Sequence, residues 1–147
     1  MRTDFSTLDI VKALGIPRER LREWMNRGFV KPTIDAKGQG TKATFTVEDI
    51  YLVALFRHLV DKGIKRFNAG IYLSENIVAG TKSFFDSNFI MIMDRSDGSL
   101  LIARESIKGL YDFLAPFLSS DDGDIEHIII VNFKKIRKIV DEALKGI

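Results

Sequence analysis

Hydrophobic positions recur at helical spacing at the start of the chain. Residues 7–14 and 17–27 each place apolar side chains three or four positions apart, on one side of a helix. The first segment opens with the capping-box pattern of Ser6 and Asp9 and ends at Gly15, a residue type that commonly terminates helices. Two short helices joined by a few residues that include a glycine are typical of a helix-turn-helix. The pattern therefore predicts this motif here.

The next part of the chain has one β-prone segment followed by two longer helices. Residues 33–44 have β-prone ends around two glycines, which predicts a β-hairpin with a mobile, basic tip. A second capping box, Thr46 and Asp49, opens a helix that we expect to run to Lys62. Its apolar residues lie nearly all round it, so this helix should be buried on more than one side. A further helix is expected at about 65–79.

The second half of the chain has a different pattern. Two short β-prone segments, 89–94 and 99–104, flank a turn and predict a hairpin. Helical spacing follows over 105–118, and the β-branched run at 126–131 predicts a buried strand. Asn132 can then cap a last amphipathic helix at 133–144.

Together these elements predict an α+β protein with two domains. The first, residues 1–79, is a winged helix-turn-helix, and the second, residues 80–147, is a small α/β accessory domain. No apolar run approaches the ~18 residues of a membrane span, and no signal-peptide core precedes the first helix. We therefore expect a cytoplasmic protein with no membrane partner.

Composition excludes several kinds of site. The chain has no cysteine, which excludes disulfides, thiolate metal sites and thiol nucleophiles. The two histidines, His58 and His127, cannot by themselves build a metal centre, and the sequence pattern places no nucleophile or carboxylate beside either. The acidic run at 121–124 lacks the ligand spacing of a calcium loop. We accordingly expect neither enzyme activity nor a cofactor.

Positive charge gathers in the first half. The formal net charge is +2, but residues 1–75 carry 13 basic and 9 acidic side chains, whereas residues 76–147 carry 9 and 11. Between residues 17 and 42 seven basic side chains face three acidic ones. Such an excess occurs both on solvated helices and on surfaces that bind polyanions.

The predicted second helix and the residues after it contain, in order, Leu21-Arg22, Trp24, Gly28, Phe29-Val30 and Pro32. This order of residues resembles the recognition-helix region of MerR-type regulators. That family has a leucine-arginine pair, aromatic residues, a glycine, two apolar residues and a proline in this order. The likeness continues through the expected wing to the corner after the third helix, and so covers about half of the chain. The matching residues there are Thr46–Asp49 and Lys62-Gly63-Ile64.

The resemblance implies a role for several of these residues. It places Leu21, Trp24 and Phe29 in the core, Arg22 at the DNA backbone, and Lys42 of the wing near a phosphate beside the minor groove.

Double-stranded DNA is therefore the expected partner. Arg18 and Arg22 lie one turn apart on the face opposite Leu21 and Met25, from which they can enter a major groove. Arg18 and Glu19, near the start of the helix, are the candidates for contacting base edges. Phosphate contacts fix the position of a protein on DNA without selecting sequence. The candidates for those contacts are Arg22, Arg27, Lys37 and Lys42.

Three features depart from the family pattern. Glu23 stands where an aromatic residue is usual, and Gly40-Thr41-Lys42 replaces a Gly-Tyr-Arg step in the wing. No sustained heptad repeat follows the third helix, so the long coiled coil through which the family dimerises is not expected.

The role of the second half stays open between alternatives. The strand at 126–131 and the helix at 133–144 could join two copies into a homodimer, or could only close the core of their own chain. Aromatic residues could line a pocket for a small-molecule effector, or could form core. A different function, a protein-protein adaptor that uses an exposed face of the third helix, is the alternative to DNA binding. The aromatic residues are Tyr72, Phe84, Phe85, Phe89, Tyr111, Phe113 and Phe117.

Overall fold

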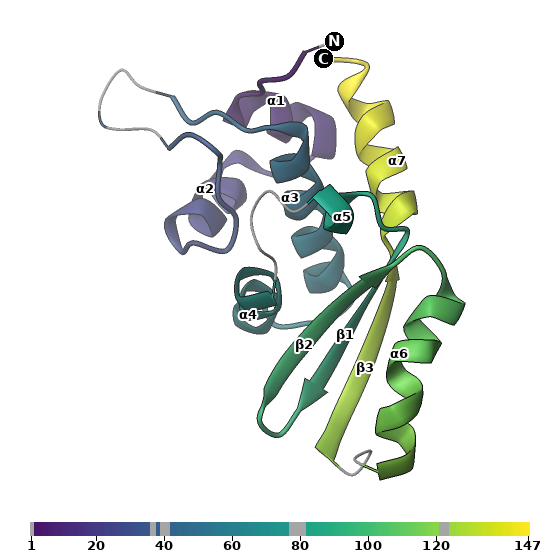
Figure 1. Cartoon of the computed structure of the whole chain (residues 1–147). Helices are drawn as coiled ribbons and strands as arrows, with labels where there is room; N and C mark the ends of the chain where they lie inside the picture. Colours follow the sequence, from purple (N-terminus) through teal and green to yellow (C-terminus); the bar gives the residue numbers. More distant parts are fainter. Residues whose placement is uncertain (1, 36–37, 39–41, 77–81, 121–123) are drawn as a thin grey trace. The chain divides into compact units, whose positions relative to one another are not determined.

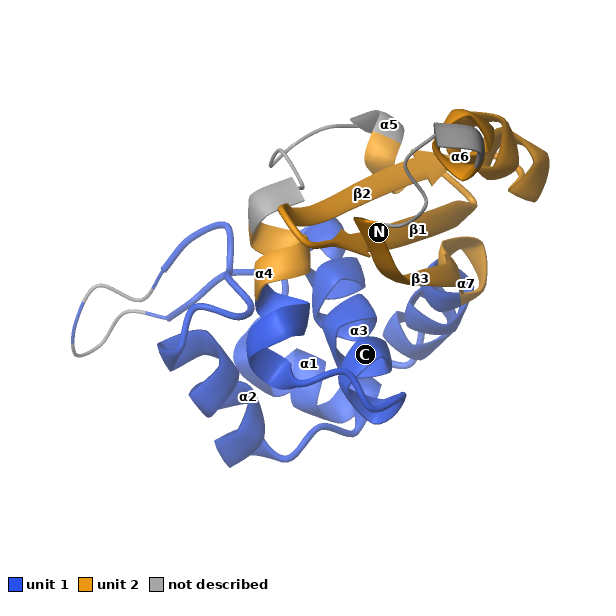
Figure 2. Ribbon diagram, turned by 90° about the horizontal axis from the view of Figure 1, so that it is seen from below, with its two compact units in different colours: residues 1–70, 136–147 blue, residues 71–135 orange. Residues whose placement is uncertain are grey.

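The computed structural model describes residues 2–35, 38, 42–76, 82–120 and 124–147 (Figure 1). By its contacts the chain forms two compact units, which Figure 2 distinguishes by colour. Unit 1 comprises residues 1–70 and 136–147, and unit 2 comprises residues 71–135. Helices combined with one antiparallel sheet confirm the expected α+β class. A boundary between independently folding domains after residue 79 stays a prediction.

Helices of unit 1 begin and end close to the residues expected from the capping pattern. Gly15 adopts φ 66° at the end of the first helix, a left-handed conformation that favours glycine. Pro17 is the N-cap of the second helix, so this helix begins at Arg18, one residue later than expected. The helices are α1 (Thr7–Leu14), α2 (Arg18–Asn26) and α3 (Val47–Asp61), followed by α4 (Arg66–Asn76), which starts in unit 1.

Both predicted capping boxes are present. The Ser6 hydroxyl accepts from the N–H of Asp9, and the Asp9 carboxylate accepts from the N–H of Ser6 at 2.8 Å. Thr46 and Asp49 make the same pair of hydrogen bonds at the start of α3. Burial acts to raise the pKa of Asp9, but the hydrogen bonds from Ser6 and Arg2 outweigh it and hold that pKa below its ordinary value.

Aromatic residues form the centre of the core in unit 1. Trp24, 2% exposed, packs edge-to-face on Phe56 with ring centroids 4.9 Å apart. Phe29 stacks on the same Phe56 ring at 5.4 Å. Gly70 of α4 lies so close that a β-carbon there would come within 2.6 Å of the Phe29 ring. The core roles that the resemblance implied for Trp24 and Phe29 thus agree with their packing.

Helix α3 is buried on several sides, as its pattern predicted. Within unit 1 its Tyr51 hydroxyl donates to Asp141 of α7 (Phe133–Leu144) at 2.6 Å. Burial, reinforced by that carboxylate, raises the pKa of Tyr51 well above its ordinary value, so the hydroxyl stays a donor. Ile136 and Val140 of α7 are buried, whereas Ile139 is 53% exposed. Most of the apolar face of α7 therefore closes the core of its own chain.

Three antiparallel strands form the sheet of unit 2 in the order β2-β1-β3. These are β1 (Phe89–Arg95), β2 (Gly98–Arg104) and β3 (Ile125–Asn132). The predicted hairpin is confirmed, because β1 and β2 pair from Phe89 with Arg104 to Arg95 with Gly98. A short helix, α5 (Lys82–Phe85), precedes β1 and was not expected from the sequence. The cap expected at α7 is also present, since Asn132 Oδ1 accepts from the N–H of Lys135 at 3.1 Å.

Helix α6 (Ile107–Ser120) lies along one face of this sheet (Figure 1). Its Leu110 packs with Met91 and Met93 of β1, and all three are fully buried. Ile90 and Ile92, which point to the other face, are also fully buried. Burial on both faces explains why β1 is an almost continuous apolar run.

The aromatic residues considered for an effector pocket do not all converge on one place. Phe84 packs edge-to-face on Phe85 with ring centroids 5.1 Å apart, whereas Phe113 and Phe117, both on α6, pack on each other at 5.5 Å and against the sheet core. Tyr111 is 59% exposed. This separation favours the interpretation that the buried rings are core.

His127 has polar neighbours that the sequence pattern did not place there. The β1–β3 register sets it opposite Asp94, with Nε2 3.7 Å from Asp94 Oδ2 and 3.5 Å from the Tyr72 hydroxyl. Tyr72 itself donates to Asp94 at 3.0 Å. Burial, with the hydrogen bond to this carboxylate, raises the pKa of Tyr72 to about 12. The expectation that no carboxylate lies beside His127 was wrong, because strand pairing joins residues far apart in sequence.

Candidate nucleic-acid interface

The surface of α2 is set by the two residues that anchor it. Leu21 and Trp24 are buried against the core, and this orientation leaves the charged residues of the helix in solvent. The sequence-predicted residues Arg18, Glu19 and Arg22 are all exposed. The structure therefore leaves these three candidate residues accessible to solvent.

The exposed surface of α2 has two basic flanks. Since successive residues turn ~100° around a helix, Arg18 and Arg22 lie only about 40° apart. Arg20 and Arg27 fall together on the other flank, and the acidic side chains lie between the two flanks. Arg18 is thus beside the half-buried Met25 rather than opposite to it, which corrects the sequence-based placement. The two flanks can face different ligands.

Glu23 has a structural explanation. Its carboxylate accepts from Arg66 at 2.6 Å and lies 3.6 Å from Arg27. These side chains are about half exposed, so each ion pair contributes only ~0.2–1 kcal/mol to stability. The acid where the family usually has an aromatic residue therefore joins α2 to the start of α4 and offsets the charge of Arg27. Sequence reasoning did not single out Arg66, because 43 positions separate the partners.

The wing is held at its base by two isolated β-bridges. Ile34 pairs with Thr44, and Phe5, ahead of α1, pairs with Phe45. Phe45 is fully buried, and Lys42 is exposed close to the first bridge. In Figures 1 and 2 these base segments and α2 lie on the same side of unit 1. Two features expected from the sequence, Lys37 and most of the wing tip, lie outside the described residues.

Asp49 ties the wing to α3. Besides its capping bond to the N–H of Thr46, its Oδ2 accepts from the N–H of Thr33 at 2.8 Å and from the Thr33 hydroxyl at 2.5 Å. One carboxylate thus holds both the start of a helix and the first residue of the wing.

We expect Asp49→Ala to lower the free energy of unfolding by about 2 kcal/mol, since it removes a helix cap and two further charge-assisted hydrogen bonds. Urea unfolding followed by far-UV circular dichroism measures this loss. Asp9→Ala is the matched control, because it removes the equivalent carboxylate of the α1 capping box and leaves the wing attached. Affinity for DNA should fall in the Asp49 variant only; an equal fall in both would show that the wing contact is not the cause.

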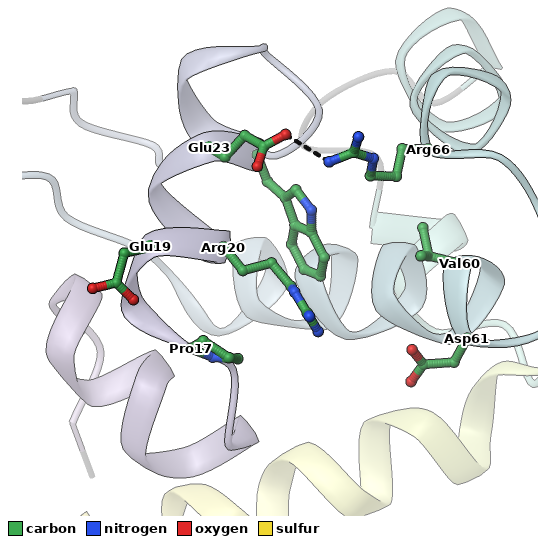
Figure 3. A pocket seen from close by; sticks show the side chains of 8 residues that line it. Pro17, Glu19, Arg20, Glu23, Val60, Asp61 and Arg66 are labelled. Atoms are coloured by element: carbon green, nitrogen blue, oxygen red, sulfur yellow. Dashed lines mark hydrogen bonds and ion pairs between the residues drawn. The ribbon is translucent and has the colours of Figure 1, made fainter.

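A groove of about 590 Å³ lies along the second flank of α2. Figure 3 shows Arg20 and Asp61 extending into the space between α2 and α3, with the Glu23–Arg66 ion pair at its upper edge. Acidic and basic groups alternate here, unlike the uniformly basic surface that binds phosphates. The first flank, with Arg18 and Arg22, is therefore the better candidate for DNA. The groove is lined by Pro17, Glu19, Arg20, Glu23, Trp24, Val60, Asp61 and Arg66.

A helix pair followed by a bridged wing is common to several DNA-binding families, so comparison with known proteins decides between them. Residues 5–74 match the family described as MerR HTH family regulatory protein. The N-terminal half of this chain is a MerR helix-turn-helix. The match contains α1, α2, the wing and α3, and it confirms the resemblance seen in the sequence.

The rest of the chain lies outside this match. No curated protein was found with significant similarity to the sequence. The MerR helix-turn-helix family is one of regulators and not of enzymes. In the part of the chain that the structure describes, no helix is both long and apolar enough to cross a membrane.

Proposed function

We propose that this protein is a sequence-specific transcription regulator that places α2 in the major groove of double-stranded DNA. The observation that carries the proposal is the exposed flank of Arg18 and Arg22, anchored by Leu21 and Trp24 within a MerR helix-turn-helix. Arg18 and Glu19 contact base edges from the start of the helix.

Phosphate contacts hold the protein in position. Arg22 lies beside Arg18, and Lys42 stands at the base of the wing, where it can contact the backbone next to the minor groove. Lys37, further along the wing, adds to this contact. Arg27 contributes less than its position suggests, since Glu23 lies 3.6 Å from its guanidinium.

The protein acts as a homodimer joined through its C-terminal half, without the coiled coil of the family. Two copies related by a two-fold axis would bind two half-sites about one DNA turn, ~34 Å, apart. The alternative function, an adaptor that docks partners on α3, has little surface to use. Among the residues of α3 only Glu48 and Asp61 are exposed.

Fluorescence anisotropy tests the proposal with labelled duplexes selected from a random-sequence pool. We expect selection to converge on one sequence and the affinity for it to fall with salt, since binding releases counterions from phosphates. Binding equally well to every duplex would contradict sequence specificity. Lack of binding even at low salt would contradict the proposal as a whole.

A further inference from the structure

Strand β3 is an edge strand with little protection. In the described residues it pairs with β1 alone, on one side. Exposed edges are usually blunted by charges, proline or bulges, because their free N–H and C=O groups can pair with another chain. A register shift at Glu126 protects only the first end of β3. Residues 128–131 are four consecutive β-branched residues without charge, and Ile130 is 50% exposed.

Helix α6 carries an apolar stripe in solvent. Ile107, Tyr111 and Leu118 are 55%, 59% and 44% exposed. Their spacing of four and seven residues puts them on one line along the helix, on which Leu114 also lies. Leu114 packs partly against the sheet core, so the stripe adjoins that core.

Packing at the start of α6 shows which edge of the sheet the stripe faces. A β-carbon on Gly109 would lie 3.2 Å from Cβ of Arg104, the last residue of β2, and the Arg104 guanidinium lies over the Phe113 ring. This side of α6 therefore faces β2. The stripe of Ile107 and Tyr111 lies about 150° away around the helix, and so faces the β3 edge. An apolar stripe and an unpaired strand edge thus adjoin in unit 2.

The charges at the ends of β3 identify what fits this surface. Glu126 lies near its start, and Lys134 and Lys135 lie two and three residues beyond its last residue. All three are exposed. When two copies of β3 pair antiparallel, the acidic start of each meets the basic end of the other, whereas parallel pairing would bring like charges together. The middle of the strand then pairs isoleucine with isoleucine.

We propose that two copies of this chain associate by antiparallel pairing of β3 with β3 into a six-stranded sheet, with the two α6 stripes packed across the two-fold axis. This inference names the surface of the homodimer in the proposed function and rests on that part of it. The pairing satisfies the free backbone groups of both edges and buries Ile130 and the stripe together. Helix α7, whose apolar face is largely buried in unit 1, is not needed for it.

Analytical ultracentrifugation of the full chain, without DNA, tests the inference. We expect the wild type to sediment at twice 16.7 kDa, and Ile130→Lys to raise the dimer dissociation constant at least tenfold. Ile139→Lys on α7 is the matched control, because Ile139 is 53% exposed against 50% for Ile130 but lies outside the surface. A monomeric wild type at ~100 µM, or equal effects of the two variants, would overturn the proposal.

Two further measurements guard against a folding defect at Ile130. Tyr111→Glu changes only the exposed stripe and should weaken the dimer in the same direction. Glu126→Lys should weaken it too, and adding Lys134→Glu and Lys135→Glu in the same chain should restore it; lack of restoration would overturn the antiparallel arrangement. DNA binding is assayed separately. A monomer that still binds DNA refutes this surface together with the proposed homodimer and leaves the DNA function standing, whereas a dimer that does not bind DNA refutes the proposed DNA function alone.

Discussion

Replacing Arg18 and Arg22 together by alanine should weaken binding to the selected duplex about 100-fold. A base-edge contact contributes ~1–3 kcal/mol, and a phosphate contact adds its own electrostatic share. Both side chains are exposed and have no ion-pair partner among the described residues, so their removal should leave the fold unchanged. Fluorescence anisotropy at fixed salt measures the loss, with circular dichroism as the check on folding.

The single variants separate the two roles. Arg22→Ala should lower affinity for all duplexes alike and reduce the slope of log affinity against log salt by about one. Arg18→Ala should instead reduce the preference for the selected sequence. Lys138→Ala, which removes an exposed cation from α7, is the control and should change neither quantity. If the Arg18/Arg22 variant binds like the wild type, α2 is not the recognition helix.

Trp24→Ala should lower the free energy of unfolding by about 3–5 kcal/mol, the range for removing a buried aromatic side chain. Trp24 is 2% exposed and fills the space between α2 and the Phe56 ring. Because Trp24 orients α2, the alanine variant should also lose DNA binding under conditions in which it is partly unfolded. Urea unfolding followed by far-UV circular dichroism measures the change, since the only tryptophan fluorophore is lost.

Two further variants test whether the loss of unfolding free energy comes from packing. The Trp24 Nε1 donor is buried and has no hydrogen-bond partner among the described residues. Trp24→Phe keeps an aromatic ring and removes that unpaired donor, so it should cost far less than alanine. Leu8→Ala on α1, where the leucine is 53% exposed, should stay within about 0.5 kcal/mol of the wild type. A loss for Leu8→Ala as large as for Trp24→Ala would contradict the packing explanation.

The helices and strands were largely predictable because their signals are local. Ser6 with Asp9 and Thr46 with Asp49 determine where α1 and α3 begin, through hydrogen bonds that span only three residues. Gly15 ends α1 through its own backbone preference. The α5 helix was missed because four residues are too short for a helical period to be visible.

Parts of the candidate site depended on long-range contacts. Nothing in the sequence explained the acidic residue at position 23, where the family usually has an aromatic one. The reason is the ion pair with Arg66, which is 43 positions away in the chain and lies 2.6 Å from the Glu23 carboxylate. The hydrogen bonds between Asp49 and Thr33 likewise join a helix cap to the wing across 16 positions. Helical or strand periodicity in the sequence does not reveal such pairs, because each pair depends on how separate elements pack together.

The sequence by itself determined the helix pair of this protein, the basic residues of α2 and the apolar residues that anchor it, because capping boxes, glycines and apolar spacing act over a few residues. Only the tertiary structure decided which flank of α2 is free of acidic partners, that α7 closes unit 1, and that β3 is an edge beside the α6 stripe. Strand order and helix packing bring together residues that are distant in the chain, and their energies depend on surfaces that exist only after folding.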